Sequence, residues 1–272
     1  MENRERLYEL MVKKRSCLCV GLDPDVHRIP ASCGEGVAGM EAFCKAIVSA
    51  THDFAVAYKP NLAFFEQYGA EGWAALKRII ESIPEDILVI ADAKRGDIGN
   101  TAKRYALAMF EELGADAVTV APYMGADSVK PFIEGHRDHW AIVLALTSNA
   151  GAEDFEFHGN PPLYERVIQR CQTWGDFNQM MFVVGATRPD LLQHARSLAP
   201  DYFFLVPGVG AQGGSLNEVM EAGWTSFGGL LINASRSILY ASDQSDFAHA
   251  AGQEAMRMQR SMAPYFESNP ER

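Results

Sequence analysis

Residues 87–101 read ILVIADAKRGDIGNT, an apolar run that ends in a cluster of charged side chains. On an extended strand alternate side chains share one face, so Asp92 and Lys94 are expected to project together. Gly96 then lets the chain turn and present Asp97 from the loop. A nearly continuous apolar strand is typical of a parallel sheet that is covered on both faces. The stretch therefore predicts a buried strand followed by a functional loop.

The same pattern of a short apolar run recurs along the whole chain. Strands are predicted over residues 17–23, 54–61, 87–94, 117–121, 140–147, 182–186, 202–207 and 229–233. Segments with helical periodicity alternate with them or follow the last one, for example 40–50, 62–83, 101–113, 162–172, 215–222 and 243–262. Eight such units predict a fold of the α/β class with a parallel sheet.

Two parallel architectures fit this alternation, a closed (β/α)8 TIM barrel and a doubly wound open sheet. Polar and glycine residues gather where the apolar runs end, in seven of the eight cases. The carboxyl ends of barrel strands are where such folds build their active sites. We therefore expect one (β/α)8 barrel domain over residues 1–272, with the open sheet as the alternative.

Composition excludes several classes of protein. The 24 Lys and Arg against 35 Asp and Glu leave a net charge of −11, which disfavours binding to nucleic acid or to an anionic membrane. The longest apolar run, 140–146, is far shorter than the roughly 20 residues that span a bilayer. The amino-terminal residues show no secretory signal, so we expect a cytoplasmic protein. Five cysteines without C-x-x-C spacing indicate reduced thiols rather than disulfides or a zinc site.

Four charged residues are expected to face one cavity from three neighbouring strands. Asp23 and Lys59 end the first two strands, and Asp92 and Lys94 end the third. A lysine between carboxylates stays protonated, which suits it to donating a proton or stabilising an anion better than to forming a Schiff base. Each residue alone would be an ordinary strand cap, but together they indicate a charged network of alternating sign.

Residues 208–214, GVGAQGG, spell G-x-G-x-x-G between a strand and a helix. This is the spacing of a dinucleotide-binding loop, which would imply an oxidoreductase. The motif lies late in the chain, however, and the next strand ends in Asn233 instead of an acidic residue, with Arg236 following. Loops after the seventh and eighth strands of barrels commonly bind phosphate. We therefore favour a phosphate monoester site over a dinucleotide site.

Other polar residues are weaker candidates. His136 and His139 are three residues apart in a polar loop without a third ligand, so we expect no metal site there. Ser148 has no neighbouring His–Asp pair, so we do not expect a hydrolytic nucleophile. Together with Thr147 and Asn149 it is better suited to hydrogen bonding a polar ring or a sugar.

At these residues the sequence resembles the orotidine 5′-phosphate decarboxylase family. Residues 89–101, VIADAKRGDIGNT, fit the family signature at each of its fixed positions, and the resemblance extends from Asp23 to Arg236. The chain length and the long segment between the fifth and sixth strands are similar to the longer bacterial subgroup. The resemblance implies a barrel homodimer that converts orotidine monophosphate to uridine monophosphate and carbon dioxide without a metal or organic cofactor.

The resemblance also implies roles for individual residues. Lys94 would deliver a proton to C6 of the pyrimidine, and Asp92 would face the departing carboxylate. Asp97 and Thr101 would reach into the site of the partner subunit. The remaining contacts are expected from Asp23 and Lys59 to the ribose and the charged network, from Ser148 to the pyrimidine, and from Gln212, Gly213 and Arg236 to the phosphate.

Three alternatives remain open. A sugar-phosphate decarboxylase or epimerase of the same superfamily can carry D-x-K-x-x-D but generally depends on a divalent metal. Residues 59–61, Lys-Pro-Asn, and the extension 97–101 favour the nucleotide enzyme. A nicotinamide-dependent oxidoreductase and a non-catalytic metabolite-binding barrel are the other two.

Overall fold

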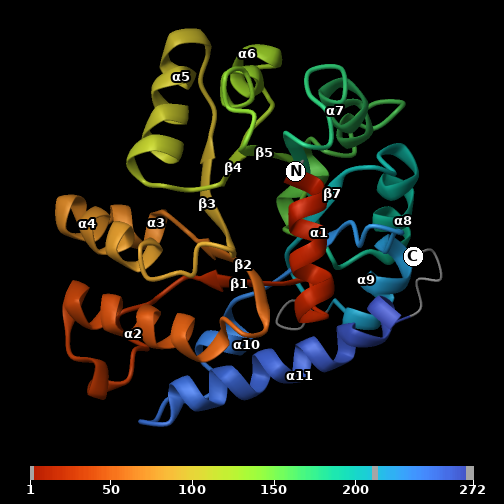
Figure 1. Ribbon diagram of the computed structural model, residues 1–272. Coiled ribbons are helices and arrows are strands. Elements are labelled where there is room, and N and C mark those ends of the chain that lie inside the picture. Colours follow the sequence, from red (N-terminus) through yellow and green to blue (C-terminus); the bar gives the residue numbers. More distant parts are fainter. Residues whose placement is uncertain (1–2, 210–213, 268–272) are drawn as a thin grey trace.

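Eight parallel strands close into a barrel in the computed structural model, which describes residues 3–209 and 214–267 (Figure 1). Each strand pairs with the next in sequence, and β8 pairs with β1. The strands are β1 Leu18–Leu22, β2 Ala55–Pro60, β3 Leu88–Arg95, β4 Ala117–Val120, β5 Trp140–Leu146, β6 Met180–Val184, β7 Phe203–Val206 and β8 Leu230–Ala234. The (β/α)8 barrel prediction is confirmed, and the open sheet is wrong.

Helices surround the barrel and cover the outer faces of the strands (Figure 1). They are α1 Asn3–Lys14, α2 Gly36–Thr51, α3 Ala63–Glu66, α4 Gly69–Ile80, α5 Gly99–Leu107, α6 Ala126–Val129, α7 Leu163–Cys171, α8 Pro189–Leu198, α9 Leu216–Gly223, α10 Arg236–Leu239 and α11 Phe247–Glu267. Short turns of other helix types are Ala31–Cys33, Ala108–Glu112, Lys130–Phe132 and Ala150–Asp154. Because strands are covered on both faces, almost every strand residue is buried, which explains the continuous apolar runs.

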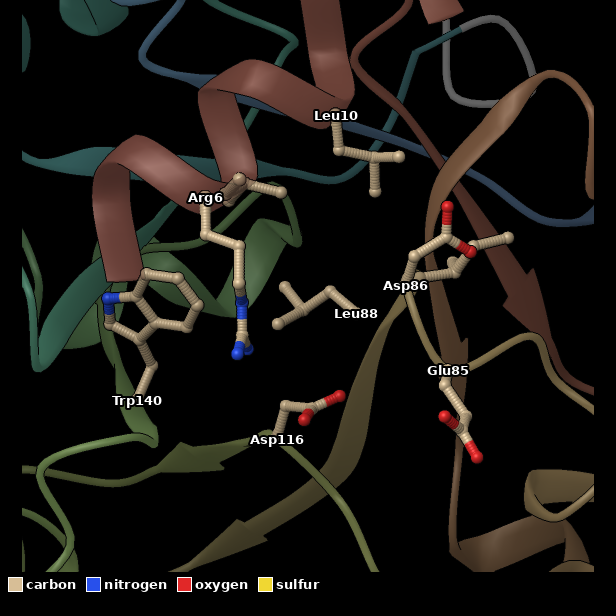
Figure 2. Close-up of a pocket in the computed structure, with 9 residues that line it drawn as sticks. Arg6, Leu10, Glu85, Asp86, Leu88, Asp116 and Trp140 are labelled. Atoms are coloured by element: carbon tan, nitrogen blue, oxygen red, sulfur yellow. The ribbon is translucent and has the colours of Figure 1, made fainter. Parts of the chain in front are cut away.

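The amino-terminal helix α1 covers the end of the barrel where the strands begin. Figure 2 shows Arg6 of α1 directed toward Asp116, between Trp140 and Leu88, which stand at the starts of β4, β5 and β3, and Leu10 lines the same cavity. The cavity left there is about 20 Å³, about the room of one water molecule. This end of the barrel is therefore closed by α1, and the polar residues that follow the strands direct the search for a substrate site to the opposite end.

The helix predicted over 62–83 is divided in two. Gly69, the first residue of α4, has a φ of +60°, a left-handed conformation that breaks the helical path from α3. A Cβ at Gly72 would stand 2.0 Å from the carbonyl oxygen of Phe65, so the two helices meet where a side chain has no room. Apolar periodicity alone did not reveal this break, because it continues through both helices.

All five cysteines are free, and Cys17, Cys19, Cys44 and Cys171 are buried. Burial raises the pKa of the Cys171 thiol to about 12. Within residues 3–209 and 214–267, no helix is long and apolar enough to cross a membrane.

Candidate active site

A carboxylate lies between two ammonium groups at the carboxyl end of the barrel strands. Asp92 Oδ2 is 2.6 Å from Lys59 Nζ, and Asp92 Oδ1 is 2.6 Å from Lys94 Nζ. The Lys59 and Asp92 side chains are 6% and 8% exposed, whereas the Lys94 side chain is 52% exposed. The structure thus brings the three residues together as predicted, with Lys94 as the ammonium that a ligand can reach.

The meeting of Asp92 and Lys94 does not come from regular strand alternation. Ala91 pairs with Val118 and Arg95 pairs with Val120, so residues 92–94 of β3 face a single residue of β4, Thr119. Lys94 has a φ of +45°, a left-handed conformation that is uncommon for a residue with a side chain. The charged side chains of Asp92 and Lys94 therefore meet through a β-bulge. A regular strand would direct the following loop away from them.

Opposite charges hold this cluster ionised. Burial alone would raise the pKa of Asp92, but the ammonium groups of Lys59 and Lys94 outweigh it and lower the pKa to about 2. Burial alone would likewise lower the pKa of Lys59, but the carboxylates of Asp92 and Asp23 outweigh it and raise the pKa. Asp92 and Lys59 therefore stay charged while the site stabilises negative charge on a ligand.

A cavity of about 210 Å³ opens beside this cluster. Its lining joins charged and polar groups to an apolar floor: Lys59, Asp92, Lys94, Thr119, Leu144, Thr147, Ser148, Asn149, Val183, Leu205 and Pro207. A neighbouring hollow of about 330 Å³ shares Thr147, Ser148 and Asn149 with it. Ser148 thus stands at the cluster, where a flat polar ring could lie between the charged wall and the apolar floor.

The ends of β1 and β8 lie side by side and hold Asp23. Asp23 Oδ2 accepts a hydrogen bond of 2.6 Å from Ser235 Oγ, while Oδ1 is buried without a hydrogen-bond partner among the described residues. Arg236 begins α10 immediately after this pair, with an exposed side chain. Gln212 and Gly213, predicted to contact phosphate, lie outside the described residues.

Asp97 and Thr101 stand apart from the cavity. Asp97 follows the bulge and accepts a hydrogen bond of 2.7 Å from the Ile98 amide, and Thr101 is exposed on α5. Ile98 beside them is 53% exposed, and Tyr123 after β4 is 87% exposed. The structure therefore places Asp97 and Thr101 on an outer surface that carries exposed apolar side chains.

The sequence did not identify two polar residues that hold the site together. Thr119 contacts both Asp92 and the backbone of Lys94, at 3.0 and 2.9 Å. Glu156 accepts hydrogen bonds from the amide and the hydroxyl of Thr147, at 2.7 and 2.6 Å. A threonine inside a strand is an ordinary β-former. Glu156 lies in a segment without periodicity, so neither residue carried a signal.

The histidines of the polar loop lie elsewhere. His136 and His139 precede β5 and pack against the ring of Phe110, with ring centroids 5.0 and 4.4 Å away. Among the residues that the structure describes, no group of three or more His, Cys, Asp or Glu side chains is arranged to hold a metal ion.

The chain is similar to known proteins along nearly its whole length. Residues 16–251 match the model of the Orotidine 5′-phosphate decarboxylase / HUMPS family. Orotidine 5′-phosphate decarboxylases of Christiangramia forsetii and Flavobacterium johnsoniae are 52% and 50% identical to this chain. Each alignment covers 97% of this chain and 98% of the relative. The structure of Leishmania donovani OMP decarboxylase superimposes with a TM-score of 0.81 at 41% identity, over 96% of this chain and all of that one. The chain belongs to the orotidine 5′-phosphate decarboxylase / HUMPS family.

Proposed function

We propose that this protein decarboxylates orotidine 5′-phosphate to uridine 5′-phosphate and carbon dioxide in pyrimidine biosynthesis. The observation that carries the proposal is the Asp92 carboxylate held between Lys59 and Lys94 at the mouth of a cavity. Full-length relatives at about half identity are orotidine 5′-phosphate decarboxylases, which favours this activity over the sugar-phosphate reactions of the wider superfamily.

The reaction needs a group that stabilises negative charge at a ring carbon. When the bond between C6 and the carboxylate breaks, the electron pair stays on C6 and carbon dioxide leaves. An ammonium fixed beside C6 stabilises this charge as it develops and then supplies the proton that completes the product. Lys94 suits this role because its Nζ is held by Asp92 while its side chain remains half exposed to the cavity.

The other side chains at the rim would position the nucleotide. Ser148 suits the pyrimidine edge, Asp23 the ribose, and Arg236 the phosphate together with Gln212 and Gly213. The Oδ1 of Asp23, buried without a donor among the described residues, supports a hydroxyl ligand, because a buried acceptor without a donor is costly. Binding energy from the phosphate and the ribose can then hold the ring against Lys94.

We also propose a homodimer in which Asp97 and Thr101 reach the site of the partner subunit. Ile98 follows Asp97 directly and is 53% exposed, and Tyr123 and Met124, which follow the neighbouring strand β4, are 87% and 47% exposed. Exposed apolar side chains of this size, rimmed by polar groups, are typical of protein interfaces.

The same proposal covers the organisation and location of the protein. We infer that residues 1–272 act as one barrel domain, since α11 returns to pack against α2 and α9 (Figure 1). Five free cysteines fit the cytoplasmic location expected from the sequence.

The decisive experiment mixes the purified protein with orotidine 5′-phosphate and follows the loss of the substrate absorbance. Turnover that persists in EDTA supports a cofactor-independent decarboxylase. Turnover that is lost in EDTA and restored by a divalent metal would indicate a metal-dependent enzyme of the superfamily instead. Tight NAD(P) binding without turnover would favour the oxidoreductase alternative.

A further inference from the structure

Thr119 of β4 lies opposite the charged bulge of β3. It is the single residue of β4 between Val118 and Val120, and across from it β3 places residues 92–94. Thr119 is 1% exposed and lines the cavity. The hydroxyl of Thr119 is therefore the polar group of β4 that faces both charged residues of the bulge.

The Thr119 hydroxyl makes two hydrogen bonds of opposite sense. It donates to Asp92 Oδ1 at 3.0 Å and accepts from the backbone amide of Lys94 at 2.9 Å. Asp92 Oδ1 is also the atom that accepts from Lys94 Nζ. One hydroxyl thus connects the carboxylate, the backbone of Lys94 and, through the carboxylate, the Lys94 ammonium.

This connection matters because Lys94 has an unfavourable backbone conformation. At a φ of +45° the residue needs surrounding contacts to keep it there. Without the Thr119 oxygen, the Lys94 amide would lose its acceptor, and the bulge could relax toward a regular strand. The Lys94 side chain would then leave the direction in which Asp92 holds it.

We propose that Thr119 is a positioning residue for the decarboxylation, fixing the backbone of Lys94 and the carboxylate of Asp92 so that the ammonium meets the reacting carbon. This role rests on the proposed function. It acts on the chemical step more than on nucleotide binding, because the phosphate and ribose contacts lie on other strands.

The test compares Thr119→Val, which keeps the shape and removes the hydroxyl, with Thr119→Ser, which keeps the hydroxyl. In Thr119→Val we expect kcat to fall about 100-fold, as small misplacements of catalytic groups do, while KM and the Kd of uridine 5′-phosphate change little. Thr119→Ser should recover most of kcat. Thr119→Ala also removes the hydroxyl, without placing a methyl group there as valine does. It should lose kcat like the valine variant, and it replaces that variant in the test if Thr119→Val does not fold.

Thr51→Val is the matched control. Thr51 is also fully buried and uses its hydroxyl for two hydrogen bonds, to the Ile47 carbonyl and to Tyr58, but it lies on α2 away from the cavity. Its loss should lower the melting temperature without changing kcat.

The outcomes are distinct. A wild-type protein without turnover overturns the proposed function itself. An active wild type whose folded Thr119→Val and Thr119→Ala variants keep their kcat overturns only the role of Thr119. A kcat as low in Thr119→Ser as in Thr119→Val would also overturn it, since the hydroxyl would then not be the group that matters.

Discussion

Lys59 Nζ and Asp92 Oδ2 lie 2.6 Å apart with both side chains more than nine-tenths buried, while the second ammonium on Asp92, that of Lys94, is half exposed. The pair divides two tasks between two lysines. Lys59 neutralises Asp92 and is 6% exposed. Lys94 shares the same carboxylate but is 52% exposed, so its ammonium is the one that can act on a ligand in the cavity.

The stability that Asp92 supplies should depend on pH in acid. Its pKa is about 2 in the folded protein and near 3.8 when unfolded, so its contribution is full above about pH 5 and declines as the pH falls toward 2. We expect the difference in unfolding free energy between wild type and Asp92→Asn to fall by about 1 kcal/mol between pH 5 and pH 3. Urea denaturation at both pH values measures it.

Other carboxyl groups titrate alike in both proteins and cancel in this difference. A difference that stays constant from pH 5 to pH 3 would show that Asp92 is not held ionised by Lys59 and Lys94.

Replacement of Lys94 should abolish turnover and leave binding. Lys94→Ala removes the ammonium beside C6, and we expect kcat to fall by at least about 1,000-fold, in line with the loss of a main electrostatic contact. Uridine 5′-phosphate should still bind, as isothermal titration calorimetry can show. Lys77→Ala, at an exposed position on α4, is the control and should keep full activity. Substantial residual turnover in Lys94→Ala would remove Lys94 from its assigned role.

The barrel was predictable from the sequence because its signal is repeated eight times. Each strand is buried on both faces, so each appears as an apolar run, and polar residues or glycine follow seven of the eight runs. Two features escaped this reasoning. The break at Gly69 depends on a backbone angle, and α1 has too weak an apolar stripe to stand out.

The candidate site was predictable to the extent that its residues end strands. Asp92, Lys94 and Lys59 could be expected near one another because they end neighbouring strands, although the bulge that joins Asp92 to Lys94 could not. Thr119 could not, because its role depends on the register shift between β3 and β4, which no local pattern encodes. Glu156 is a similar case, since its partner Thr147 is reached only after the intervening segment folds back.

Arg236 should matter only for substrates that carry a phosphate. Loss of a charged hydrogen bond costs about 1.5–3 kcal/mol, so we expect Arg236→Ala to lower kcat/KM for orotidine 5′-phosphate by about 10- to 100-fold. The slow turnover of orotidine, which lacks the phosphate, should not change. Arg188→Ala is the control and should leave kcat/KM unchanged. Arg188 is also an arginine near the site, but it lines the neighbouring hollow and pairs with Asp190. Equal losses on both substrates would place the Arg236 contact elsewhere.

If Asp97 of each subunit completes the site of its partner, two inactive variants should complement each other in a mixed dimer. Lys94→Ala and Asp97→Ala should each have little activity alone. After equal amounts are unfolded and refolded together, we expect about a quarter of the wild-type activity, because half of the dimers are mixed and each mixed dimer keeps one intact site. Lys94→Ala refolded with the double variant Lys94→Ala/Asp97→Ala should stay inactive. If Asp97 served its own subunit, the first mixture would also stay inactive.

Arg196 should stabilise the barrel without affecting turnover. Its guanidinium is buried at the end where β7 and β8 begin, and it donates hydrogen bonds to the carbonyls of Gly223, Ala199, Tyr202 and Gly229 at 2.6–3.0 Å. Arg196→Met fills similar space but leaves these buried acceptors without a donor, so we expect the unfolding free energy to fall by about 3 kcal/mol. Because Arg196 lies at the closed end of the barrel, kcat and KM measured on the folded protein should not change. Arg260→Met, at an exposed position on α11, should shift stability by less than about 0.5 kcal/mol in the same urea titration. Equal stability of the two variants would mean that water replaces the lost donors, and a fall in kcat for Arg196→Met would mean that the two ends of the barrel are coupled.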